Sequence, residues 1–162
     1  MYGDGEGVLV RPDGVIAWRA GGPVTPEDIR GARGGYRSAM TSRIAVIAID
    51  AVDPRRVAEF WTAVLGWHIV EEEPDIVSIA PEGGAGIGID VVKVPERKSV
   101  KNRLHLDLRA DGSTQGVEVE RLLGLGARRV DVGQGPDVSW VMLADPEGNE
   151  FCVLSRSVQD LN

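Results

Sequence analysis

The alternation of apolar and polar positions predicts a compact first module. An almost continuous run of apolar, β-branched residues fills positions 43–49 and indicates a buried strand. A helix is expected from Pro54, with Asp53 as N-cap, because apolar residues then recur at helical spacing until the stop signal Gly66. Further strands are predicted at residues 67–72, 75–80 and 87–94, which gives the order βαβββ.

The same order of signals returns about 60 residues later. Residues 103–109 read as a strand, and Ser113 or Thr114 begins a helix that ends at the glycines of positions 124–126. The remaining strands are expected at residues 127–132, 137–144 and 150–154. This repeat predicts an α+β fold of two βαβββ modules, at residues 41–97 and 103–158.

A tight turn is predicted between the last two strands. Asp145-Pro146 is followed by Gly148-Asn149, and proline presets φ while glycine and asparagine tolerate positive φ. The flanking strands should therefore pair as a hairpin. Because a duplicated unit makes a symmetric cup, we expect the interior of that cup to carry the function.

The first forty residues differ in composition from the rest. They hold nine of the 21 glycines and equal numbers of acidic and basic residues, so the whole net charge of -7 lies in residues 41–162. We expect a short hairpin with a turn at residues 12–14, then a glycine-rich linker up to residue 40. Residues 159–162 are expected to form a C-terminal tail.

The overall composition is that of an ordinary globular domain. Its 43% hydrophobic and 27% charged residues suit a single compact domain, and the negative charge argues against a nucleic-acid partner. Cys152 is the single cysteine, so no internal disulfide can form, and neither a signal peptide nor a long apolar run is present. These features predict a cytoplasmic protein with no membrane partner.

Residues 41–158 resemble the vicinal oxygen chelate superfamily, in its glyoxalase-like branch. The resemblance rests on the Asp53-Pro54 helix entry, the Phe60-Trp61 pair followed by Leu65-Gly66, the Lys101-Asn-Arg-Leu-His-Leu-Asp107 strand and the DPEGNEFCVL sequence at residues 145–154. It implies a curled, cup-like mixed sheet around a small-molecule cavity, as in bleomycin-resistance proteins, and a homodimer. Residues 1–30 separately resemble the C-terminal tail of FAD-dependent aromatic polyketide hydroxylases, which suggests natural-product biosynthesis as the setting.

The resemblance also implies four positions for metal ligands, on the first and last strands of each module. Ala45 or Val46 occupies the first position and cannot coordinate a metal; Asp90 is near the second, His105 is at the third and Cys152 at the fourth. Glu150 shares the strand face of Cys152. No metal cofactor is therefore expected. If a divalent metal is bound, its ligands are predicted from His105, Asp90, Glu150 and Cys152.

Several residues are candidates for binding or catalysis. His105 and Asp107 share a strand face and are the candidate catalytic pair, because a carboxylate orients an imidazole as a general base. The alternative is a hydrogen-bonded histidine beside a solvated aspartate. The candidate ligand-binding residues are Trp140, Met142, Asp90, His105 and Trp61, although core packing is the competing interpretation for the aromatic residues and the methionine.

Lysine and arginine residues cluster at positions 93–103, between the modules. They form either a solvated hinge or a docking site for an anionic ligand at the rim of the cup. The sequence as a whole predicts a protein that binds a small organic molecule, in natural-product biosynthesis or resistance. The alternative is a metal-dependent lyase, isomerase or dioxygenase of the same superfamily.

Overall fold

The computed structural model describes residues 6–10, 16–21, 42–84 and 86–161, and the chain divides into two compact units, Met1–Arg43 and Ile44–Asn162. In the first unit, β1 (Glu6–Val10) pairs antiparallel with β2 (Ile16–Gly21). The hairpin is therefore present as predicted. The turn predicted at residues 12–14 and most of the predicted linker lie outside the described residues.

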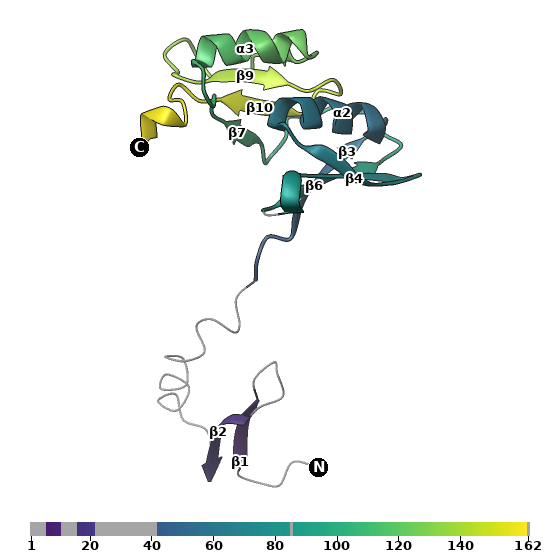
Figure 1. Ribbon diagram of the computed structural model, residues 1–162, viewed down its shortest axis with the longest axis vertical. Helices are drawn as coiled ribbons and strands as arrows, with labels where there is room; N and C mark the ends of the chain where they lie inside the picture. The colour runs from purple at the N-terminus through teal and green to yellow at the C-terminus, as the bar shows by residue number, and fades with distance from the viewer. Residues whose placement is uncertain (1–5, 11–15, 22–41, 85, 162) are drawn as a thin grey trace. The chain divides into compact units, whose positions relative to one another are not determined.

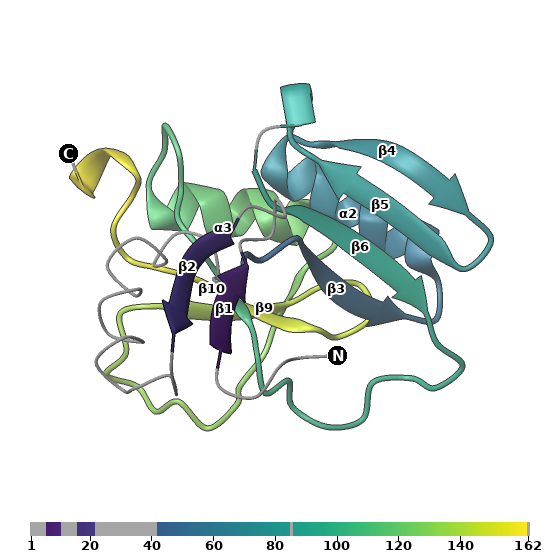
Figure 2. The same ribbon diagram turned by 90° about the horizontal axis from the view of Figure 1, so that it is seen from below.

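The first module contains β3 (Val46–Ala51), α2 (Pro54–Leu65), β4 (His68–Glu73), β5 (Ile76–Ala80), the short 3-10 helix η1 (Glu82–Gly84) and β6 (Gly88–Lys93). Its sheet has the order β3-β6-β5-β4, and β3 runs parallel to β6. Helix α2 covers one face of this sheet (Figure 2). Asp53 caps the helix by accepting a hydrogen bond from the Arg56 amide, and Gly66 ends it in a left-handed conformation, as predicted.

The second module contains β7 (Leu106–Leu108), α3 (Gln115–Gly124), β8 (Arg128–Arg129), β9 (Val141–Ala144) and β10 (Glu150–Val153), and the 3-10 helix η2 (Gln159–Leu161) follows it. Its sheet order, β7-β10-β9-β8, repeats that of the first module. Helix α3 lies across one face of the sheet (Figure 1). The predicted α+β fold with two βαβββ modules is therefore confirmed.

All four strands of the second module are shorter than predicted. The pattern at residues 103–109 yields only Leu106–Leu108, and the apolar run at residues 137–144 becomes a strand only from Val141. Between β8 and β9, Gly133 and Gly135 both adopt positive φ, which interrupts strand pairing. The segment therefore forms a long connection, and Trp140 precedes the strand on which it was expected.

The two modules share one hydrophobic core. Phe60 and Trp61 of α2 pack against Phe151 of β10, with ring centroids 6.0 and 5.1 Å apart, and all three side chains are buried. Aromatic pairs in edge or tilted contact stabilise a core beyond the area that they bury. The helix of the first module thus completes the core of the second. None of the described helices has the length and apolar character that a membrane span requires.

Residues of the second module also bind both ends of α2. The Glu147 carboxylate accepts hydrogen bonds from the backbone amides of Val52 and Asp53, each 2.7 Å long, at the N-terminal end of the helix. At the other end, the Arg121 guanidinium donates to the carbonyls of Ala63 and Val64, at 3.0 and 2.9 Å. A carboxylate at the N-terminus and a guanidinium at the C-terminus both complement the helix dipole.

The turn after β9 holds Glu147 in place. Asp145 is fully buried, and its carboxylate accepts hydrogen bonds from the amides of Glu147 and Asn149 and from the Asn149 side chain, each 2.9 Å long. Gly148 supplies the positive φ that closes the turn. The tight turn predicted from the sequence therefore also connects the two modules.

We expect Glu147→Ala to lower the free energy of unfolding by about 1–3 kcal/mol, because two amides at the start of α2 lose a charged acceptor. Urea denaturation followed by circular dichroism measures this change. Glu82→Ala is the matched control, since Glu82 is exposed in η1. An equal effect in both variants would show that Glu147 does not stabilise the contact between the modules.

Candidate functional site

A cavity of about 570 Å³ lies between β3, the linker that joins the modules, and the turn before β10. Its apolar wall comes from Ile47 and Ile49 of β3, from Trp61 of α2 and from Leu106 of β7. The linker and the turn contribute most of the remaining lining, with ionisable side chains among apolar and uncharged polar ones. This volume is within the range that proteins use to bind small organic ligands.

The linker wall of the cavity is fixed by Glu150 of β10. Lys98 Nζ donates to Glu150 Oε1 at 2.7 Å, and the Asn102 amide donates to Oε2 at 3.0 Å. The Lys98 and Glu150 side chains are only 17% and 10% exposed. Burial alone would raise the pKa of Glu150, but the hydrogen bonds from Lys98 and Asn102 outweigh it and lower that pKa below its ordinary value. Glu150 therefore stays ionised at neutral pH.

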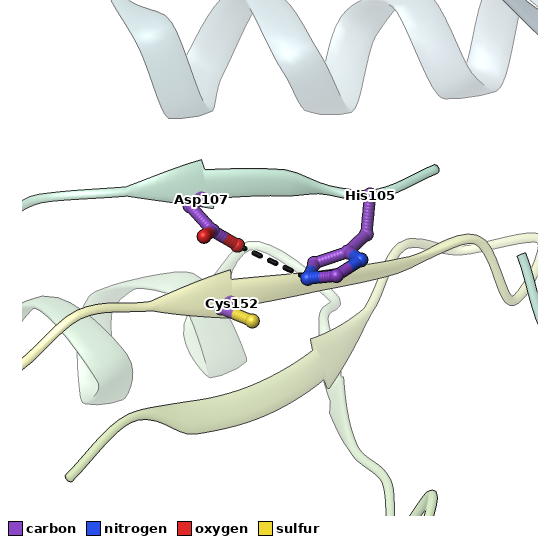
Figure 3. Close-up of side chains that lie close together, drawn as sticks. All are labelled: His105, Asp107 and Cys152. Carbon is purple, nitrogen blue, oxygen red and sulfur yellow. Dashed lines mark ion pairs between the residues drawn. The ribbon is translucent and has the colours of Figure 1, made fainter. Parts of the chain in front are cut away.

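Three potential ligand atoms meet beside the cavity. Atoms of His105, Asp107 and Cys152 lie within 4.8 Å of one another, and their side chains point to the same side of the sheet (Figure 3). Cys152 is directly opposite Asp107 in the parallel pairing of β10 with β7. His105 Nε2 lies 3.3 Å from Asp107 Oδ1, as an ion pair would place them. The structure thus brings together the predicted catalytic pair and the cysteine.

The Cys152 thiol is unreactive in this environment. Burial, reinforced by the adjacent Asp107 carboxylate, raises the pKa of the Cys152 thiol to about 12. Its Sγ lies 3.1 Å from the Met142 sulfur, and both side chains are buried. Because the thiolate is the nucleophilic form, this protonated thiol is a poor nucleophile at neutral pH.

The residues do not reproduce the four-position metal set that the superfamily implies. Val46 and Ala48 are the exposed residues of β3 near its start, and neither has a donor atom. Asp90 of β6 accepts a hydrogen bond from the Ser78 hydroxyl at 2.7 Å, and Glu150 is held by Lys98 and Asn102. Of the four predicted metal ligands, only His105 and Cys152 lie close together. The third residue of this cluster is Asp107, which was not among the predicted ligands.

The five predicted ligand-binding residues are not all at the cavity. Trp61 and His105 line it, whereas Trp140, Met142 and Asp90 are not among the lining residues. Met142 is buried beside Cys152, and the Trp140 side chain, before the start of β9, is 39% exposed. The roles of Glu147 and Lys98 were not predicted from the sequence. The basic cluster at positions 93–103 could have indicated Lys98. Nothing in the sequence around Glu147 indicates that it binds the backbone at the start of α2.

The comparisons with known proteins agree with this architecture. Residues 46–154 match the family model described as a glyoxalase-like domain. No match was found among curated proteins. Similar solved structures include a glyoxalase/bleomycin resistance protein/dioxygenase family enzyme from Burkholderia phytofirmans PsJN, with 18% identity, a TM-score of 0.52, and coverage of 69% of this chain and 97% of that one.

Two further structures have the same fold at low identity. TnmS3, an antibiotic binding protein from Streptomyces sp. CB03234, is 21% identical with a TM-score of 0.52, and the match covers 73% of this chain and 98% of that one. The fosfomycin resistance protein FosX from Listeria monocytogenes is 13% identical with a TM-score of 0.56, and the match covers 75% and 97%. The family match spans both modules, and the chain belongs to the family of glyoxalase-like domains.

Proposed function

We propose that this protein binds a small organic molecule in the cavity between β3, the inter-module linker and the turn before β10. The observation that carries this proposal is the combination of a volume of about 570 Å³ with an apolar wall and with polar groups from the linker and the turn. Such a cavity buries the body of a ligand while the polar groups orient it. Binding alone is sufficient for sequestration of a compound.

The setting that we propose is natural-product biosynthesis or resistance. TnmS3, which has the same fold, is described as an antibiotic binding protein, and FosX as a fosfomycin resistance protein. The only cysteine, Cys152, is free and buried, so a reducing cytoplasm suits the chain. We also propose a homodimer, because Ile44, Val100 and Leu104 are 68–76% exposed and a second copy would cover them.

A second candidate function is metal-dependent catalysis, which the cluster of His105, Asp107 and Cys152 favours. A thiolate, an imidazole and a carboxylate together suit zinc and leave one position open. A variant of FosX from Listeria monocytogenes was solved with Mn(II). In this role, Asp107 would also orient the His105 imidazole. Two of the four positions that the superfamily uses lack a free donor here, so binding remains the preferred function.

Filling the cavity should weaken binding. Ala48 of β3 lines the cavity and is exposed, so Ala48→Trp adds bulk there without disturbing the core. We expect the neutral probe N-phenyl-1-naphthylamine to bind the wild type saturably and to bind this variant at least about tenfold more weakly, a change of about 1.4 kcal/mol. Probe fluorescence measures the affinity. Ala63→Trp, on the exposed side of α2, is the control, and equal binding by both variants would place the ligand elsewhere.

We expect the purified protein to contain well under one metal ion per chain, with no further loss in His105→Ala or Cys152→Ser. Elemental analysis after dialysis measures this content. Cys152→Ser should cost about 1 kcal/mol of stability, because a hydroxyl replaces a buried, weakly polar thiol. One zinc or manganese ion per chain that both substitutions remove would instead support the metal-dependent enzyme.

Acid should open the linker wall of the cavity. The pKa of Glu150 is lower in the folded protein than its ordinary value of 4.5, so its ionised form stabilises the wall above that value. This stabilisation is lost as the pH falls through the lowered folded pKa. We therefore expect N-phenyl-1-naphthylamine affinity to be constant from pH 7 to pH 5 and to fall in stronger acid. Glu150→Gln should bind more weakly at neutral pH and lose this acid transition; an unchanged profile in the variant would exclude Glu150 as the group responsible.

A further inference from the structure

We propose that the ligand of this cavity is an anion, with a negatively charged group on an apolar, aromatic body. This inference deepens the proposed binding function and rests on it. It follows from three independent properties of the cavity: the charges of its linker wall, an unpartnered indole N–H, and its apolar floor.

The linker wall carries an unusual excess of positive charge. Residues 97–103 contain four basic residues and no acidic residue, in a chain that has 25 acidic and 18 basic residues. All four basic residues line the cavity, and Lys98 is neutralised by Glu150. The other three, Arg97, Lys101 and Arg103, are exposed and form no ion pair with the described residues. Among the described residues, the Lys101 ammonium forms a hydrogen bond with the Asn102 carbonyl alone, at 3.3 Å.

The acidic residues of the lining are largely committed to other partners. Glu150 is neutralised by Lys98, and Glu147 accepts two backbone hydrogen bonds at the positive end of α2. Asp50 and Glu96 remain. The four basic and four acidic residues of the lining balance in formal charge, but the basic ones are gathered in residues 97–103. An anionic group bound against residues 97–103 would therefore meet a locally attractive field, which is stronger in a partly enclosed site than in water.

Trp61 supplies a second reason for a ligand with a hydrogen-bond acceptor. The side chain lines the cavity and is only 1% exposed. Its Nε1 atom is buried and has no hydrogen-bond partner among the described residues. A buried donor without an acceptor is unfavourable, and an oxygen atom of a bound ligand would remove that cost. A negatively charged oxygen is the strongest acceptor for this purpose.

The rest of the wall selects an apolar body. Ile47, Ile49 and Leu106 line the cavity beside the Trp61 ring. Burial of an aromatic body against these side chains provides affinity, while the charged group provides orientation. A solvated hinge would explain the basic residues alone, but it would leave the buried indole N–H without an acceptor.

Two fluorescent probes that differ by one sulfonate group test the proposal. 8-Anilino-1-naphthalenesulfonate carries the anion, and N-phenyl-1-naphthylamine is the neutral counterpart of the same shape. We expect the wild type to bind the sulfonate at least about tenfold more tightly at low salt, as charge-assisted hydrogen bonds predict. Added salt should weaken the binding of the sulfonate and leave the affinity for the neutral probe almost unchanged.

Matched variants locate the effect. Lys101→Gln with Arg103→Gln should remove most of the preference for the sulfonate, and Arg128→Gln with Arg129→Gln, which removes the same charge at β8 outside the cavity, should retain it. Trp61→Phe should weaken binding of the sulfonate several-fold more than binding of the neutral probe, because the smaller phenyl ring affects both probes whereas the loss of the N–H affects the acceptor. If Trp61→Phe does not fold, the exposed charge variants still decide the question.

The outcomes separate this inference from the proposed function. Equal affinity of the wild type for both probes, or a preference that survives Lys101→Gln with Arg103→Gln, would overturn the anionic ligand while cavity binding stands. If Ala48→Trp does not weaken either probe, binding in this cavity is itself wrong. A sulfonate preference that depends on Lys101, Arg103 and Trp61 supports both.

Discussion

The contact of helix α2 with the second module is the constraint on which the rest of the structure depends. Two backbone amides at its start and two carbonyls near its end have their partners in side chains of that module, Glu147 and Arg121. Between these ends, Phe60 and Trp61 pack on Phe151. Because the termini of a helix leave backbone groups unsatisfied, the second module completes a helix that the first cannot complete alone. The cavity lies beside this contact, so its shape depends on the same bonds.

The local features of the fold could be predicted from the sequence because their causes are local. Asp53, Pro54 and Gly66 set the limits of α2 by their own conformational preferences, and the same holds for the turn at Asp145. Their repetition indicated the duplication. The shortening of the strands after Gly133 was not predicted, because apolar alternation continues through a segment whose backbone does not pair.

The candidate site was predicted only in part, because some of the candidate side chains form hydrogen bonds with other residues instead. His105 and Asp107 are two positions apart on one strand, so their common face follows from strand geometry. The carboxylates of Asp90 and Glu150 could bind a metal, but each already accepts a hydrogen bond. The donor to Asp90 is Ser78, and the donor to Glu150 is Lys98. These hydrogen bonds join residues that are close in space but far apart in the sequence. Spacing alone therefore identifies potential ligands without showing which of them are free.

The parallel pairing of the first and last strands of each module has a consequence for how the chain folds. In each module the first strand pairs with the last one, β3 with β6 and β7 with β10, so neither sheet is complete until its final strand has been synthesised. The first sheet can therefore assemble earlier, but its helix still lacks Glu147 and Arg121. Pairing over such sequence distances slows folding because the intervening chain must close first. Helix α2 therefore obtains its full set of partners only when the second module has formed, which makes the stability of the first module depend on the second.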